Sequence, residues 1–268
     1  IDIYSPVLST HDTYLKLFQL SKPVLGQYKV FYVDEFQDAN DVTIDLALNQ
    51  REQGKIVVVG DERQQIYSWR GSVNALNKIN APTGMLSKSF RYGERVANIA
   101  TKILKHTMLI KGNENVDTKV GAWDSDVIDY SKPYTILFRK NTTLIYRAID
   151  LIREKQEVSI NIDLKDFVKM LTSANELMME NLSKVKHENI LPYTEWKELT
   201  EEAKFDGSLA KLVKIVHEGE ADSIIELLHS YKNHPGAHIT LTTSHKAKGL
   251  EYDQVILGDD FPSNYDNK

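Results

Sequence analysis

Residues 29–38 read Lys-Val-Phe-Tyr-Val-Asp-Glu-Phe-Gln-Asp. The β-branched and aromatic run over residues 30–33 is typical of a strand buried on both faces of a parallel sheet. The run ends at Asp34 and Glu35, and open α/β sheets bind their ligands at the carboxyl ends of their strands. One acid can hold Mg²⁺, and the other can orient and deprotonate an attacking water. Solvated acids that merely follow a strand are the simpler alternative.

A second predicted strand ends in the same manner. Residues 55–71 read Lys-Ile-Val-Val-Val-Gly-Asp-Glu-Arg-Gln-Gln-Ile-Tyr-Ser-Trp-Arg-Gly, and Gly60 and Asp61 break the apolar run. An amide beside a strand-end acid can sense a γ-phosphate, and aromatic side chains can stack unpaired bases at about 1–3 kcal/mol per base. The loop supplies Gln64, Gln65, Tyr67, Trp69 and Arg70. Ordinary core packing is the alternative interpretation of the two aromatic residues.

The composition is that of a globular protein with one large domain or two small ones in 268 residues. No apolar run approaches the roughly 20 residues of a membrane span, and no secretory signal is visible, so we expect an intracellular protein without a membrane partner. Cysteine is absent, which excludes disulfides and cysteine-bound zinc. With a net charge of −5, nucleic acid would have to bind in a local groove.

The order of the predicted elements favours an α/β fold. A helix begins at Thr10 and stops at Pro23, and a second covers residues 41–53 between the two strands, which predicts a parallel β–α–β unit. A third helix has apolar residues at three- and four-residue steps from Val96 to Leu104. The other predicted elements are strands over residues 134–138, 239–242 and 254–257 and helices over residues 144–152, 166–171, 210–216 and 223–231.

Four ordered motifs resemble those of UvrD/Rep-type superfamily 1 DNA helicases. Residues 33–38 match the Walker B segment of that family, and residues 60–71 match its third motif. Ser89-Phe90-Arg91 is similar to the fourth motif, where the family more often has Asn-Tyr-Arg. The fifth motif is matched by Thr-Ser-His-Lys-Ala-Lys-Gly-Leu-Glu-Tyr at residues 243–252.

Within that family the chain most resembles the F-box DNA helicase branch. The likeness covers most of residues 9–153 and 237–262. The stretches that carry the resemblance to this branch are residues 10–17, residues 64–67 running on to 73–76, and residues 245–251 followed by Asp259-Asp260-Phe261.

The resemblance implies a RecA-like α/β fold of the P-loop NTPase type, with the parallel sheets of two motor lobes, both incomplete, and a small all-helical insertion. The implied boundaries are the end of an accessory DNA-contacting subdomain over 1–28, the first lobe over 29–86, the second lobe over 87–153 and 237–268, and the insertion over 154–236.

The resemblance also implies ATP and Mg²⁺ as cofactors and a role for each motif residue. Asp34 would hold Mg²⁺, Glu35 would activate water, and Gln64 would sense the γ-phosphate. Arg91 would be an arginine finger, and Gly249 and Glu251 would contact the nucleotide. Single-stranded DNA and duplex junctions are the implied partners, and any protein partner stays unidentified. The implied DNA-contacting residues are Tyr67, Trp69, Arg70, Thr243 and His245.

The sequence contains no Gly-x-x-x-x-Gly-Lys-[Ser/Thr] loop, which normally holds the β- and γ-phosphates. The sixth motif of the family is also absent. We therefore expect a central fragment of an ATP-dependent 3′–5′ DNA helicase or translocase of repair or recombination, inactive as an ATPase by itself.

Three alternatives to the motor stay open at this point. One is a catalytically inert DNA-binding or interaction module, against which the intact Asp34–Glu35 pair and Arg91 argue. Another is the motor part of a helicase–nuclease. A metal site at His229, His234 and His238 is the least favoured, because no acid or cysteine completes the set.

Overall fold

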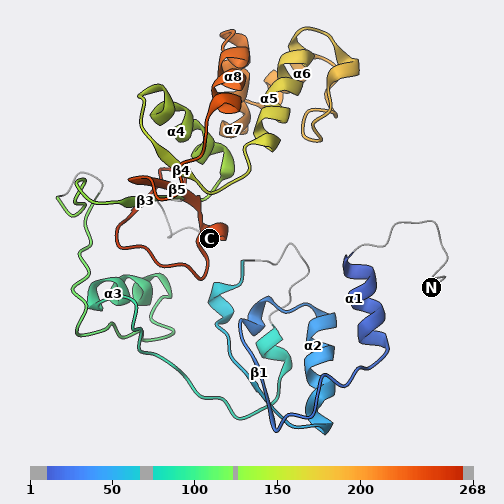
Figure 1. Cartoon of the computed structure of the whole chain (residues 1–268), viewed down its shortest axis with the longest axis vertical. Helices are drawn as coiled ribbons and strands as arrows, with labels where there is room; N and C mark the ends of the chain where they lie inside the picture. Colours follow the sequence, from blue (N-terminus) through green and yellow to red (C-terminus); the bar gives the residue numbers. More distant parts are fainter. Residues whose placement is uncertain (1–10, 67–74, 123–125, 262–268) are drawn as a thin grey trace. The chain divides into compact units, whose positions relative to one another are not determined.

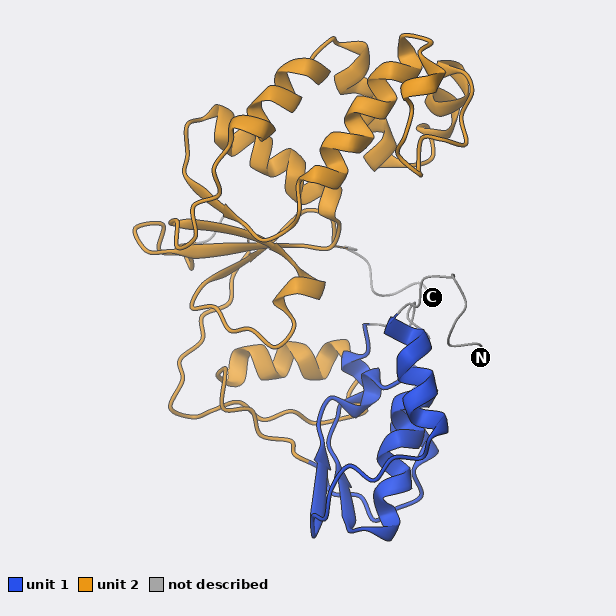
Figure 2. Cartoon of the chain, turned by 45° about the vertical axis from the view of Figure 1, so that its right-hand side comes forward, with its two compact units in different colours: residues 1–85 blue, residues 86–268 orange. Residues whose placement is uncertain are grey.

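A computed structural model describes residues 11–66, 75–122 and 126–261 of the chain. The chain separates into two compact units, Ile1–Met85 and Leu86–Lys268, which Figure 2 colours separately. Each unit has its own sheet and its own apolar core. Over the described ranges, no helix combines the length and the apolar character that crossing a membrane requires.

The first unit is built on a short parallel sheet. β1 (Val30–Val33) and β2 (Lys55–Val58) lie side by side with Val33 opposite Val58, and α2 (Asp41–Leu48) connects them. The predicted parallel β–α–β order is confirmed. The unit also contains α1 (His11–Leu20) and the 3₁₀ turns Phe36–Asp38, Asn49–Glu52, Glu62–Gln64 and Ala75–Lys78.

The start of α2 anchors the segment that carries the acid pair. The Asn40 side chain accepts a hydrogen bond from the Thr43 N–H at 2.9 Å, which satisfies one of the donors that the first turn of a helix leaves open. Ile44 is buried on the inner face of α2 and packs in one cluster with Phe36 and Ala75. Because Phe36 directly follows the two acids, this cluster fixes the chain at the end of β1.

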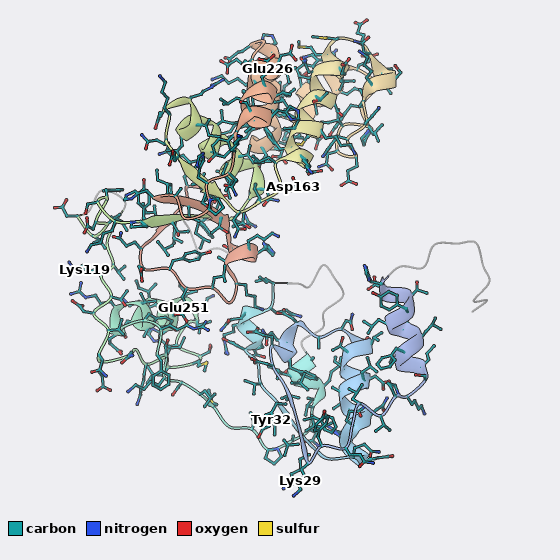
Figure 3. All side chains as sticks on the ribbon, in the orientation of Figure 1. Lys29, Tyr32, Lys119, Asp163, Glu226 and Glu251 are labelled. Atoms are coloured by element: carbon teal, nitrogen blue, oxygen red, sulfur yellow. The ribbon has the colours of Figure 1, made fainter. Side chains whose placement is uncertain are left out.

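One expectation for β1 is wrong: the strand is not buried on both faces. Tyr32, labelled in Figure 3, is 75% exposed, and its register partner Val57 is 40% exposed. Side chains alternate between the faces of a strand, so Val33 and Val58 turn to the core while Tyr32 and Val57 share the other face. Over the described residues, this sheet has two strands and no element covers that second face.

The second unit contains a four-stranded sheet over the described residues, with all strands parallel in the order β4-β5-β3-β6. Its buried positions include Ile136, Phe138 and Leu241, as expected for parallel strands covered by helices. The strands are β3 (Tyr134–Phe138), β4 (Val158–Ile160), β5 (Ile239–Thr243) and β6 (Val255–Leu257).

The prediction of an all-helical segment over residues 154–236 is wrong at its start, because β4 belongs to the sheet. Val158 pairs with Ile239, and Ile160 pairs with Leu241. The far edge of β4 is held by Asn233, whose amide accepts from the Ile160 N–H at 2.7 Å and donates to the Ile160 carbonyl at 3.2 Å. A strand of three residues is too short for a periodic pattern, and its stability comes from partners distant in the sequence.

After β4 the chain is mainly helical up to residue 230, and these helices share an apolar core with α4. Leu171, Leu199 and Ile224 are fully or almost fully buried in that core. Figure 1 shows these helices gathered with α4 at one end of the second unit. The helices are α4 (Asn141–Arg153), α5 (Lys165–Met178), α6 (Trp196–Glu202), α7 (Gly207–His217) and α8 (Ala221–Ser230); α3 (Glu94–Ile103) and α9 (Ser244–Ala247) lie elsewhere in the unit.

Candidate functional site

The end of β1 turns sharply at the two acids. Glu35 has a left-handed backbone conformation, with φ 51° and ψ 36°, which is uncommon for a residue other than glycine. Its N–H donates to Asp34 Oδ1 at 2.9 Å, and the following N–H, of Phe36, donates to the Val59 carbonyl at 3.0 Å. The turn therefore exposes both carboxylates while it ties the chain to the end of β2.

Gln37 joins the two strand ends through its side chain, which is only 1% exposed. Its Nε2 donates to Glu35 Oε2 at 2.6 Å, and its Oε1 accepts from the Asp61 N–H at 3.0 Å. Gly60 leaves room for this amide, since a Cβ atom at residue 60 would overlap Gln37 Oε1. Sequence reasoning did not assign a role to Gln37.

Gln64 is held by the same network. Asp61 begins the 3₁₀ turn Glu62–Gln64, and its carboxylate accepts from the Arg63 N–H at 3.0 Å and from Gln64 Nε2 at 2.9 Å. Glu35 and Gln64, both predicted from the sequence, are thus connected through Gln37 and Asp61. The other predicted residues of this loop, Tyr67, Trp69 and Arg70, lie outside the described residues.

The second unit brings together two further predicted residues. Arg91 Nε lies 2.6 Å from Glu251 Oε1, and the two side chains are 62% and 64% exposed. Arg91 precedes α3, and its N–H donates to Ser89 Oγ at 3.2 Å; Glu251, labelled in Figure 3, follows α9. An ion pair this exposed contributes at most about 1 kcal/mol, so it places the two groups together without holding either tightly.

The remaining predicted residues lie around the end of β5. His245 is exposed on α9, whereas Thr243, the last residue of β5, is only 3% exposed. Gly249 has φ +79°, a conformation that favours glycine, and the space where a Cβ atom would lie is open. His245 is therefore the more accessible of the two predicted DNA contacts at this strand end.

A strand-end feature that sequence reasoning missed lies between β3 and α4. The Asp260 carboxylate accepts from the Arg139 N–H at 2.9 Å and from the Lys140 N–H at 2.7 Å. These residues border an open cleft of about 290 Å³, where Lys211 Nζ lies 5.3 Å from the centre of the Tyr146 ring. Burial, and secondarily the charge of Asp206, raises the pKa of the Tyr146 phenol. In the sequence, Asp260 was noted only for the resemblance to the F-box branch, without its partners Arg139 and Lys140.

The chemistry at the end of β1 suits a magnesium–nucleotide site. Mg²⁺ is commonly held by one or two carboxylates together with substrate phosphates, and Asp34 and Glu35 offer two exposed carboxylates at a strand end. Within the described ranges, no three or more acid, histidine or cysteine side chains gather into a site that could hold a metal alone. Two exposed carboxylates at a strand end are a donor set that fits a metal also coordinated by the phosphates of a substrate.

Comparison with known proteins bears directly on this site. The family model of the UvrD/REP helicase N-terminal domain matches residues 8–80, the stretch that contains both strand ends. The chain belongs to the UvrD/Rep helicase family. The resemblance inferred from the motifs is thereby confirmed.

Two F-box helicases are similar to this UvrD/Rep family member over almost its whole length. It is 31% identical to F-box DNA helicase 1 of Gallus gallus over 94% of the chain, and 30% identical to F-box DNA helicase protein 1 of Schizosaccharomyces pombe over 96%. It is 36% identical to the ATP-dependent DNA helicase PcrA of Leuconostoc citreum, over 40% of the chain. The chain spans 26% and 32% of the length of the two F-box helicases.

Proposed function

We propose that the chain forms part of the motor of an ATP-dependent DNA helicase that moves 3′ to 5′ on single-stranded DNA in repair or recombination. The observation that carries the proposal is the hydrogen-bonded link from Glu35 to Gln64 within the stretch matched by the helicase model. A strand-end acid and an amide held in one network are what hydrolysis of a phosphoanhydride requires: a base for water and a donor for the phosphate.

The role proposed for each residue follows from its motif. Asp34 holds Mg²⁺, which neutralises charge on the phosphates of ATP, and Glu35 orients the attacking water and takes up its proton. Gln64 donates to the γ-phosphate. In this structure Gln64 Nε2 donates to the Asp61 carboxylate, and its NH₂ group has two hydrogens with which to donate.

Further nucleotide-contacting roles are proposed for motif residues of the second unit. Arg91 stabilises charge that develops on the transferred phosphoryl group, as arginine fingers do. Glu251 binds the ribose, and Gly249 lets the backbone approach it closely. The Arg91–Glu251 pair supports this assignment, because it gathers two motif residues from distant parts of the sequence at one place.

DNA contacts are proposed for both units. Tyr67 and Trp69 stack bases and Arg70 binds phosphate, while Thr243 and His245 bind the strand from the second unit; duplex junctions are bound where the strand is separated. The limited exposure of Thr243 favours a contact through its backbone or after a small shift of α9. An intracellular location follows from an activity on DNA.

The proposed domain organisation places 1–28 in an accessory subdomain and 29–86 in the first motor lobe. The second lobe comprises 87–153, β4 and 237–268, with a helical insertion after β4. Because the sequence contains no phosphate-binding loop, we expect these 268 residues alone not to hydrolyse ATP appreciably.

The proposal is tested by strand displacement, using a natural polypeptide that contains both this chain and a phosphate-binding loop. A labelled duplex with a 3′ single-stranded tail should be unwound with ATP and Mg²⁺, and one with a 5′ tail should not. Tight DNA binding without ATP-dependent unwinding would support the inert module instead. Cleavage of the labelled strand would support the helicase–nuclease.

A further inference from the structure

Gln37 is a buried polar residue to which the motifs assign no role. Its side chain is 1% exposed, and both ends of its amide are bonded, Nε2 to Glu35 Oε2 at 2.6 Å and Oε1 to the Asp61 N–H at 3.0 Å. Its backbone carbonyl accepts from Gln65 Nε2 at 3.3 Å. Gln37 therefore contacts the acid of one strand end and the turn of the other.

The orientation of this amide is set by its neighbours. Turning it over would place Oε1 against the Glu35 carboxylate and the NH₂ group against the Asp61 N–H, so that acceptor faced acceptor and donor faced donor. Gly60 adds a steric condition, because a Cβ atom there would occupy the space of Oε1. The neighbouring groups thus fix the orientation of the Gln37 amide.

The contacts form a continuous path from Glu35 through Gln37 and Asp61 to Gln64. A shift of the Glu35 carboxylate changes the bond to Gln37, and a shift of Gln37 changes the position at which the Glu62–Gln64 turn begins. In the opposite direction, a movement of Gln64 away from Asp61 changes the contacts of Gln37 and therefore the position of the Glu35 carboxylate.

We infer that Gln37 is a positioning residue that aims the Glu35 carboxylate for hydrolysis and couples it to the Gln64 turn. This inference rests on the proposed function. Gln37 itself does not touch ATP; it acts through Glu35 and Asp61.

The first test is Gln37→Met, which keeps a similar volume and removes both hydrogen bonds of the amide. Gln50→Met is the matched control: Gln50 is also 1% exposed, in the same unit, and bonds to the carbonyls of Leu46 and Pro23 rather than to the acids. In the ATP-hydrolysing polypeptide, Gln37→Met should lower kcat roughly 10- to 100-fold with little change in ATP affinity, because a bond to a charged group is lost. Gln50→Met should leave kcat within about two-fold of the native value, because only stability is affected.

The second test uses the pH dependence of kcat to distinguish a positioning role of Gln37 from a packing role. Gln37→Glu keeps the shape of the side chain but places a second carboxyl group beside Glu35, in a buried position. When ionised, the introduced group repels Glu35; when protonated, it can donate to Glu35 as the amide did. Burial and the neighbouring charge raise the pKa of the introduced carboxyl, so the ratio of variant to native kcat should rise as the pH falls.

Different results would overturn the inference about Gln37 and the proposed function. A Gln37→Met variant with native kcat, or a Gln50→Met variant impaired as much, would overturn the inference, as would a pH-independent ratio for Gln37→Glu. Glu35→Gln is measured in parallel. If Glu35→Gln abolishes hydrolysis and Gln37→Met does not reduce it, the inference alone fails; if Glu35→Gln leaves hydrolysis intact, the proposed function fails.

Discussion

Gly60→Ala is the substitution that probes the geometry of the strand ends most sharply. A Cβ atom at residue 60 would overlap Gln37 Oε1 and lie 3.2 Å from the backbone nitrogens of Gln37 and Phe36. The two nitrogens belong to a turn tied to β2, so the Gln37 side chain is the part that can move. Moving it breaks the hydrogen bond from the Asp61 N–H.

Three contributions determine the expected change in the free energy of unfolding for Gly60→Ala. A buried polar group left without its partner costs about 1–3 kcal/mol, and a methyl group forced into a filled site costs about 1–3 kcal/mol. Gly60 does not have a positive φ, so alanine is compatible with its backbone and recovers about 0.4–1 kcal/mol through the unfolded state. We expect the free energy of unfolding of the first unit to fall by about 1–5 kcal/mol.

The assay is urea denaturation of the chain followed by hydrogen exchange and mass spectrometry, with the midpoint taken from peptides within residues 29–65. Gly84→Ala is the control in the same unit, because no atom lies within 4 Å of its Cβ position. It should leave stability unchanged or raise it by up to about 1 kcal/mol. Equal effects of the two substitutions would refute the reasoning, since the cost would then not come from Gln37.

Three further predictions concern the second unit. Asp260→Asn should lower its free energy of unfolding by about 1 kcal/mol in urea denaturation, because a charged acceptor for two backbone N–H groups is lost, while Asp259→Asn at the adjacent exposed residue should change it by less than about 0.5 kcal/mol. Tyr146 has a raised pKa in the folded state, so above pH 10.0 the unfolded chain loses its phenolic proton first and the stability of the unit falls; Tyr146→Phe should reduce this fall, and an unaltered pH profile would contradict the assignment. Glu251→Gln should change stability by less than about 1 kcal/mol, because the pair with Arg91 is exposed, and a larger loss would show that the pair is structural.

Local composition was enough to predict the positions of the acids. The apolar run over residues 30–33 and the break at Asp34 reflect local preferences, and β1 and β3 are found where these preferences place them. The motif at residues 243–252 indicated Gly249 through the family resemblance, and the positive φ found there is a conformation that glycine adopts readily. Such features depend on neighbours in the sequence and can be inferred from it.

The role of Gln37 could not be predicted in this way. Its oxygen accepts from Asp61, 24 residues along the chain, and the approach depends on the missing side chain of Gly60. Asp260 is a similar case, since its partners Arg139 and Lys140 lie 121 and 120 residues away. β4 was missed for the same reason, because its stability comes from β5 and Asn233.

The exposure of Tyr32 was not predicted for a different reason. The strand was identified correctly, but burial on both faces was inferred from side-chain type alone. An aromatic residue is compatible with either face of a strand, and which face is covered depends on the other elements of the sheet.

The central claim is that Glu35 activates water for ATP hydrolysis, and single-turnover hydrolysis at saturating ATP, Mg²⁺ and single-stranded DNA tests it most directly. In a natural polypeptide that contains this chain and a phosphate-binding loop, Glu35→Gln should slow hydrolysis by about 10²–10⁴-fold while ATP affinity stays near the native value. A variant that hydrolyses ATP at the native rate would contradict the account.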